Sequence, residues 1–151
     1  MKSITAKTMA LIAVSTALFS FSSKPGGEGF EIYLNNKVMI QQYGREMNTG
    51  QSLRLDQASP DDKLTIRYHH CGKTGKNRVV TIKNGQDKVL KEFRYADAAT
   101  QVSSMTVQVK EILNIKNAAS TTLRLYYTSS ELPAGRMLAS LNTIAPATVK
   151  R

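Results

Sequence analysis

The sequence predicts an all-β protein: a single antiparallel β-sandwich, or a partly open barrel, of about eight short strands after an N-terminal signal peptide. Three observations lead to this prediction. Apolar and polar residues alternate from residue 30 onward, turn residues separate the alternating stretches, and no segment beyond the N-terminal apolar run has a convincing helical period. Parallel strands need crossover segments of about a dozen residues. Because the chain of 151 residues has no room for several, the strands should be antiparallel.

The first 22 residues have the features of a secretory signal peptide. Lys2 and Lys7 precede an apolar run of 13 residues, 9–21. That run is too short to span a bilayer, which takes ~20 residues, but it has the length of a signal's hydrophobic region. Small residues favour cleavage after Ser22, with cleavage after Ala17 as the alternative. A buried N-terminal helix is the alternative to a signal peptide altogether.

The rest of the chain divides into a flexible linker (23–29), one β-sandwich domain (30–144) and a tail (145–151) that we expect to be frayed. The absence of an internal repeat or a low-complexity tract favours one domain. No cysteine stands at the end of the apolar run, so the lipoprotein route is excluded. We therefore expect a protein exported to the periplasm or the extracellular space, with no transmembrane segment after cleavage.

Alternation and turn residues together place the strands. The expected strands are 31–34, 37–40, 52–56, 63–71, 78–83, 88–95, 105–109, 122–127 and 136–143. Two further segments are not assigned as separate strands. Residues 110–115 either continue the strand 105–109 or form one helical turn, and residues 131–135 form a turn.

Two hairpins carry the strongest turn residues. Asn35-Asn36 predicts a two-residue turn, which sets Ile32 opposite Met39. Asn84-Gly85 predicts a second hairpin, for which a two-residue loop and a four-residue loop both fit.

The stretch 63–71 has the clearest alternation. Its even-numbered positions, from Leu64 to His70, share one face, which leaves Arg67, His69 and Cys71 on the other. The apolar faces of this and other strands predict the core. The core candidates are Leu64, Ile66, Tyr68, Val80, Ile82, Val107, Val109, Leu123 and Leu125.

The chain is strongly basic, with a net charge of +10. Removal of residues 1–22 leaves 19 basic against 11 acidic residues, a net charge of +8. Residues 67–94 form the basic segment, and four of its cations are candidates for binding anionic groups from exposed positions. These are Arg67, Lys73, Lys76 and Arg78. A solvated face whose charged edges block sheet-to-sheet aggregation is the alternative.

The charge also defines the class of partner. An exported basic protein meets anionic polysaccharide, lipid headgroups or another envelope protein. It does not meet a genome, so we expect no specific nucleic acid as partner.

The run His69-His70-Cys71 suggests an alternative chemistry. On a strand, His69 and Cys71 share a face with Cα atoms ~6.5–7 Å apart, twice the ~3.3 Å rise per residue. With a third ligand from a neighbouring strand, they could hold one copper-type metal ion. A cysteine beside a histidine also occurs in small cysteine-dependent enzymes. A single cysteine excludes an intrachain disulfide and multi-cysteine zinc sites, and no cofactor is predicted.

Several stretches resemble a group of small exported β-rich proteins of Bacteroidota-type bacteria. The stretches are EIYLNNKVMIQQ, YHHCGKTGKNRVVTIKNG, KEFRYADA and YYTSSELPAGR. The resemblance implies export from a two-membrane bacterium and a β-rich fold, and it implies no catalytic residue, cofactor or substrate. We therefore expect a non-enzymatic protein that serves in binding or interaction at the bacterial cell envelope.

The signal peptide makes a direct prediction about processing. Because the apolar run is short, follows positive charge and ends in small residues, the exported protein should begin near Ser23. The intact mass of the protein recovered from the envelope fraction checks this. A full-length mass that retains Met1 would contradict it.

Overall fold

A computed structural model describes residues 27–56, 58–119 and 122–142 of the chain. The predicted signal peptide (1–22) and tail (145–151) lie outside the described residues, as do most of the linker and the last two residues of the predicted domain.

The described residues form strands, one α-helix and one 3₁₀ helix. In chain order they are β1 (Gly29–Leu34), β2 (Lys37–Tyr43), the 3₁₀ helix η2 (Gly44–Asn48), β3 (Ser52–Arg54), β4 (Lys63–His69), β5 (Arg78–Lys83), β6 (Val89–Tyr95), β7 (Met105–Gln108), α2 (Val109–Ala119), β8 (Leu123–Ser129) and β9 (Leu132–Asn142). No helix within these ranges has the length and apolar character that crossing a membrane requires.

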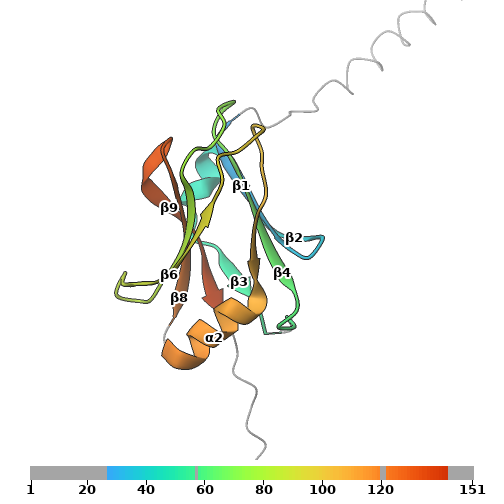
Figure 1. Cartoon of the computed structure of the whole chain (residues 1–151), viewed down its shortest axis with the longest axis vertical. Coiled ribbons are helices and arrows are strands. Elements are labelled where there is room, and N and C mark those ends of the chain that lie inside the picture. Colours follow the sequence, from blue (N-terminus) through green and yellow to red (C-terminus); the bar gives the residue numbers. More distant parts are fainter. Residues whose placement is uncertain (1–26, 57, 120–121, 143–151) are drawn as a thin grey trace, which may run out of the picture.

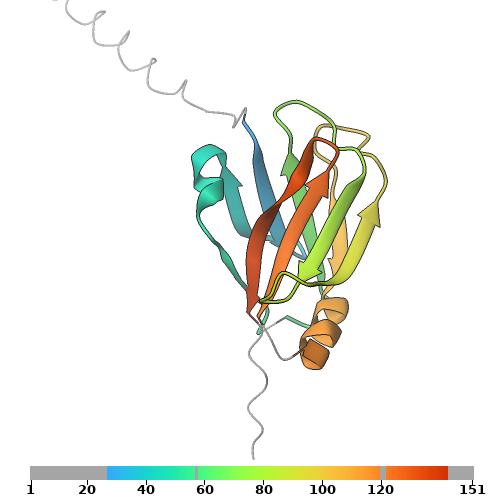
Figure 2. The same ribbon diagram turned by 90° about the vertical axis from the view of Figure 1, so that its left-hand side faces the viewer.

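The strands form two sheets that face each other, as the two views in Figures 1 and 2 show. One sheet has four strands in the order β2-β1-β4-β7, and the other has five in the order β3-β9-β8-β5-β6. Every described pairing is antiparallel except that of the three-residue β3 with β9, which is parallel. The all-β sandwich prediction is confirmed.

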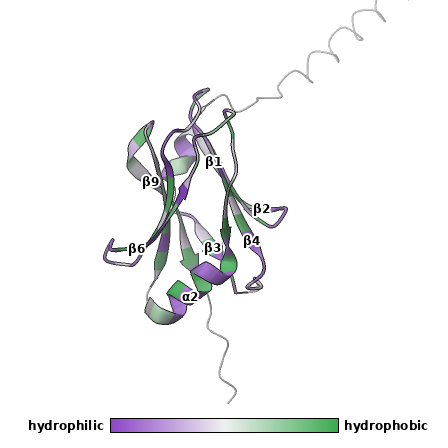
Figure 3. Ribbon diagram, viewed as in Figure 1, coloured by the Kyte–Doolittle hydropathy of each residue, from purple (hydrophilic) through white to green (hydrophobic). Residues whose placement is uncertain are grey.

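The core lies between the two sheets, and Figure 3 shows apolar residues on the strands and on α2. All nine residues predicted for the core are buried, with exposed fractions of 3% or less. The alternation in β4 explains this outcome, because its even positions are buried and its odd positions are exposed or half-buried. Other buried residues include Phe30, Ile32, Leu53, Leu55, Ile112, Tyr127 and Leu141.

The helix α2 was not predicted at its full length. One helical turn or a continued strand was expected over 110–115, whereas the structure has a helix of 11 residues. Two backbone bonds anchor its start, from the Val109 N–H to the Asp62 carbonyl (2.9 Å) and from the Lys110 N–H to the Pro60 carbonyl (3.1 Å). Val109 and Ile112 are buried one helical turn apart. The anchors come from residues almost 50 positions earlier, so no local pattern indicates them.

The turn predicted over 131–135 is also wrong. Ser129 pairs with Leu132, so the turn is Ser130-Glu131, and β9 starts at Leu132 instead of residue 136. The strand contains Pro133. Proline is tolerated there because β3 pairs with β9 only from Ser140 onward, which leaves this part of β9 at an edge.

The first hairpin agrees with its predicted turn but differs in its register. Leu34 pairs with Lys37, which confirms the two-residue turn Asn35-Asn36. Ile32 pairs with Ile40 instead of Met39, because the pairing shifts by one residue between Ile32 and Tyr33. Such a β-bulge inserts an extra residue in one strand and cannot be read from alternation alone.

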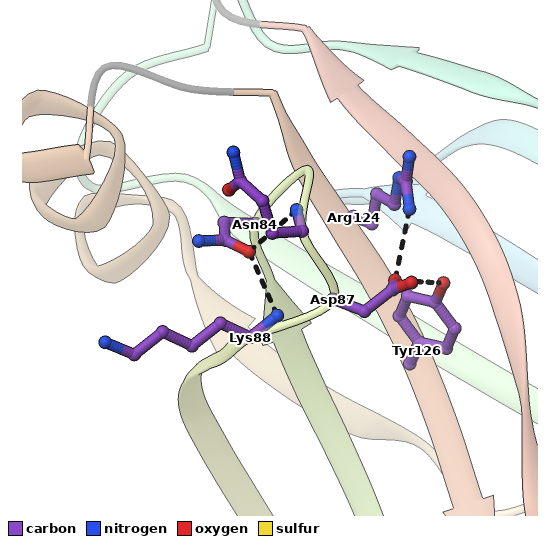
Figure 4. Close-up of polar contacts among 6 residues, drawn as sticks. Asn84, Asp87, Lys88, Arg124 and Tyr126 are labelled. Carbon is purple, nitrogen blue, oxygen red and sulfur yellow. Dashed lines mark hydrogen bonds and ion pairs between the residues drawn. The ribbon is translucent and has the colours of Figure 1, made fainter.

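The second hairpin has a three-residue loop, Gly85–Asp87, instead of the two-residue or four-residue loop expected. The Asn84 N–H donates to the Lys88 carbonyl (3.0 Å), and the Asp87 N–H donates to the Asn84 carbonyl (3.1 Å). Asp87 has a φ of 61°, the left-handed geometry that closes a loop of this length. The Asn84 side chain accepts from the backbone N–H groups of Gln86 and Lys88, both at 3.0 Å; Figure 4 shows these contacts.

Ile66 tests the inner face of β4. The side chain is 0% exposed, so Ile66→Ala should lower the free energy of unfolding by ~2–5 kcal/mol through lost apolar burial and the cavity left behind. The exposed Lys63→Ala, on the same strand, should change it by no more than ~0.5 kcal/mol. Urea unfolding measures both, and equal costs would contradict the assignment of faces.

Candidate functional site

The segment predicted to hold a metal leaves the strand earlier than expected. β4 ends at His69, not at Cys71. The Lys73 N–H donates to the His70 carbonyl (3.1 Å), and Cys71 and Gly72 have positive φ angles of 50° and 84°. Cys71 therefore lies in a tight turn, and the same-face spacing with His69 on which the metal prediction depended is wrong.

His69 and Cys71 nevertheless line one small cavity of about 210 Å³. Its lining residues are Gly27, His69, His70, Cys71, Gly72, Gln101 and Val102. Within the described ranges, no three His, Cys, Asp or Glu side chains are grouped to hold a metal ion, and the exposed Cys71 thiol has no hydrogen bond to either imidazole. Metal binding and thiol chemistry at this position stay predictions without a supporting contact.

His70 is a buried structural residue, 7% exposed, on the face predicted for it. Its Nε2 lies 2.9 Å from the Tyr127 hydroxyl and 3.3 Å from the Ser129 hydroxyl. Burial lowers the pKa of His70, and the attraction of Glu131 and Glu28 opposes that shift only in part. A neutral imidazole is therefore favoured in a hydrogen-bonded position between the sheets.

Arg78 does not lie at the surface. It was expected to be an exposed cation, but it is only 7% exposed. Its Nε and Nη2 donate to the Ala96 carbonyl (2.9 and 2.7 Å), and its Nη1 donates to the Ser103 carbonyl (2.9 Å). The guanidinium thus fixes the loop between β6 and β7, because it joins two carbonyls of that loop to the start of β5.

The remaining predicted cations do not converge on one face. Lys73 and Lys76 are exposed in the loop between β4 and β5, while Arg67 lies on the outer face of the four-stranded sheet. The segment 67–94 contributes strands to both sheets, so its cations are divided between them, and binding at Lys73 and Lys76 stays a prediction.

On the five-stranded sheet, the positive charges already have partners. The Lys83 ammonium lies 4.3 Å from the centre of the Tyr126 ring. Arg124 forms an ion pair with Asp87 (3.1 Å), and Asp87 also accepts from the Tyr126 hydroxyl (3.3 Å), as Figure 4 shows. Lys91 pairs with Glu111 (2.7 Å) and Arg94 with Glu92 (2.9 Å). This sheet therefore offers fewer unpaired cations than its composition suggests.

The outer face of the four-stranded sheet carries a connected group of polar and aromatic side chains. We call Glu31, Tyr33, Gln41, Tyr43, Arg67 and His69 the outer-sheet platform. Glu31 is its centre and accepts from the hydroxyls of Tyr43 (2.5 Å) and Tyr33 (2.7 Å) and from the Gln41 amide (3.0 Å). Partial burial alone would raise the pKa of Glu31, but these hydrogen bonds outweigh it and lower that pKa, so the carboxylate is charged.

A glycine allows Tyr43 to lie across the strand next to it. Gly29 pairs with Tyr43 on one side and with His69 on the other. A Cβ at Gly29 would lie only 2.0 Å from Cδ1 of Tyr43, so only glycine leaves space for the ring. The ring then meets His69 edge-on, with the two ring centres 5.6 Å apart.

Arg67 is positioned without an acidic partner. It is the direct cross-strand neighbour of Glu31, yet the two form no ion pair. Its Nε donates to the Ser104 hydroxyl (3.1 Å), and its guanidinium carbon lies 5.0 Å from the centre of the Tyr33 ring. The side chain is exposed, and no carboxylate within the described residues pairs with it. The positive charge of Arg67 is therefore fixed in position and accessible to a ligand.

A cavity of about 370 Å³ opens beside Arg67. Its lining residues are Tyr33, Asn35, Asn36, Thr65, Arg67, Ser104 and Thr106. They come from β1, the β1–β2 turn, β4, β7 and the residue just before β7, and Arg67 is the charged residue among them. The volume falls in the range of ~300–1,000 Å³ that is typical of small-molecule sites.

Of the cavity residues, only Arg67 was a binding candidate in the sequence analysis. Tyr33, Thr65 and Thr106 each stand on the polar side of an alternating strand. That signal places them on an outer face but does not show that the three strands are adjacent. The chain matches no protein-family model, and no curated protein is significantly similar to it in sequence. The functional assignment therefore depends on the geometry of the chain itself.

The buried position of Arg78 makes a prediction about stability. Arg78→Ser leaves the Ala96 and Ser103 carbonyls without their charged donor, and hydrogen bonds to charged groups contribute ~1.5–3 kcal/mol each. The free energy of unfolding should therefore fall by at least ~1.5 kcal/mol. Lys76→Ser removes the same charge from an exposed side chain two residues earlier and should have little effect. Equal stability of the two variants, measured by urea unfolding, would contradict this account.

Proposed function

We propose that this chain is an exported, non-enzymatic binding protein of the bacterial cell envelope, which binds an anionic group of its ligand at Arg67. The observation that carries the proposal is a guanidinium fixed by Ser104 and Tyr33 on an open sheet face, beside a carboxylate that it does not pair with. Export follows from the predicted signal peptide.

The geometry favours binding by this arginine because its orientation is set in advance. A planar guanidinium grips a carboxylate or phosphate through two parallel hydrogen bonds, but a long side chain loses rotamer freedom when it does so. The Ser104 bond and the Tyr33 ring already restrict the Arg67 side chain. Its terminal nitrogens are therefore presented to a ligand at a reduced entropic cost.

The neighbouring acid, Glu31, is held away from an ion pair with Arg67. Glu31 has its oxygens engaged by two tyrosine hydroxyls and the Gln41 amide, which keeps it from turning toward Arg67. The net charge of +8 that remains after removal of residues 1–22 adds a long-range attraction for anionic ligands. Anionic polysaccharide, lipid headgroups and acidic proteins all have this chemistry, and polysaccharide agrees best with a cavity lined by hydroxyl and amide groups.

Retention on heparin resin tests the proposal, since heparin offers both carboxylate and sulfate. Arg67→Ala should weaken binding on the order of tenfold, because the lost hydrogen bonds are charge-assisted. Arg67→Lys keeps the charge but not the planar fork, so it should recover only part of the affinity. Binding should also weaken with salt, because the Debye length falls from ~10 Å at 0.1 M to ~3 Å at 1 M.

Arg94→Ala is the matched control. It removes one positive charge from an exposed side chain on the other sheet, where Arg94 pairs with Glu92. If Arg67→Ala and Arg94→Ala elute at the same salt concentration, diffuse net charge explains the binding and Arg67 is not a site.

A further inference from the structure

We infer that the group bound at Arg67 is the carboxylate of a uronic acid residue in a polysaccharide, and that the sugar ring occupies the cavity beside it. This inference rests on the proposed function and narrows it to one class of ligand. It draws on three features of the cavity: its charge, the chemistry of its lining and the rigidity of its rim.

The charge of the cavity suits a single negative charge. Arg67 is its charged lining residue, and the Glu31 carboxylate lies directly across from it on the neighbouring strand. A uronic acid brings one carboxylate per sugar, which one guanidinium matches. A densely sulfated or phosphorylated sugar would bring further negative charge toward Glu31, and no second cation lines the cavity to offset it.

The remaining lining suits the hydroxyl groups of a sugar. Thr65 and Thr106 are cross-strand partners whose hydroxyl oxygens lie 3.3 Å apart, and Ser104 and Asn36 add a hydroxyl and an amide. A hydroxyl has one donor and two acceptor positions, so each threonine keeps capacity beyond the bond between the two. These neutral groups can exchange hydrogen bonds with a pyranose ring without adding charge.

The rim of the cavity is held by Asn35, whose side-chain amide forms hydrogen bonds through both its nitrogen and its oxygen. The Asn35 amide donates to Asp62 (3.0 Å), and its oxygen accepts from the Lys63 N–H (3.0 Å). These bonds tie the β1–β2 turn to the start of β4, where the Asn35 N–H also donates to the Lys63 carbonyl (2.7 Å). The next residue, Asn36, is thereby fixed at the cavity edge.

Tyr33 is the aromatic residue in the lining of the cavity. Its hydroxyl donates to Glu31 (2.7 Å) and the Arg67 guanidinium lies over one face of its ring, so only the remaining ring surface can serve as an apolar contact. Aromatic rings and the C–H faces of sugars bury apolar area against each other, whereas a free sulfate or phosphate gains nothing from such a surface. The cavity thus combines one cation, several neutral hydrogen-bonding groups and part of one aromatic ring.

Calorimetry with oligogalacturonate tests the inference on the intact mature protein. Reduction of the oligomer's carboxylates to alcohols should weaken binding at least tenfold, and so should Arg67→Ala with the unreduced oligomer. Thr65→Val and Thr106→Val keep the side-chain shape but remove a hydroxyl, and each should weaken binding several-fold. Thr128→Val is the matched control from β8 of the other sheet and should bind like the unsubstituted protein.

Sulfated dextran and unsubstituted dextran complete the comparison, and thermal midpoints near that of the unsubstituted protein confirm that each variant folds. If sulfated dextran binds as tightly as oligogalacturonate and both depend on Arg67, the proposed function stands and the uronic acid inference fails. If the threonine variants bind oligogalacturonate normally, the sugar ring is not in the cavity and the inference fails. If Arg67→Ala changes binding to no anionic polymer, the proposed function fails with it.

Discussion

The burial of apolar side chains between two sheets is the constraint on which the rest of this structure depends. In β1 and β4, Ile32 and Ile66 are fully buried and pair directly across the strands. Because side chains alternate, this pairing also places Glu31 opposite Arg67 on the outer face. A slip of one residue would bury Arg67 and expose Ile66, so the same apolar burial that stabilises the fold also sets the geometry of the outer-sheet platform.

Polar contacts close the sandwich at the end where β4 meets the following loop. The Tyr68 and Tyr127 rings stack across the two sheets with their centres 4.5 Å apart. The Tyr68 hydroxyl donates to Glu28 and accepts from Arg136 at 3.0 Å, and burial, followed by the Glu28 bond, raises the pKa of Tyr68 above its usual range. Arg78 also contributes to the fold, because its guanidinium donates to the Ala96 and Ser103 carbonyls of the loop between β6 and β7. Some of the positive charge therefore stabilises the fold instead of contacting a ligand.

The contrast between Arg67 and Arg78 shows why net charge does not locate a binding site. Both were candidate ligand-binding residues, and both belong to the basic segment 67–94. Arg78 is committed to two backbone carbonyls, whereas Arg67 is anchored by one bond and a ring while its charge has no acidic partner in the described chain. The proposed uronic acid site follows from that difference and from the neutral groups around Arg67.

The sequence by itself determined the fold class, the inner face of each main strand and the turn at Asn35-Asn36, because strand alternation and turn chemistry are local properties. Only the tertiary structure decided the helix α2, which is anchored by Asp62 and Pro60, and the turn that removes Cys71 from its strand. It also decided that Arg67 meets Ser104, 37 residues away, and that both border one cavity with Tyr33. Such contacts depend on which strands become neighbours and in what register, and that is settled by packing of the whole core, which no local pattern encodes.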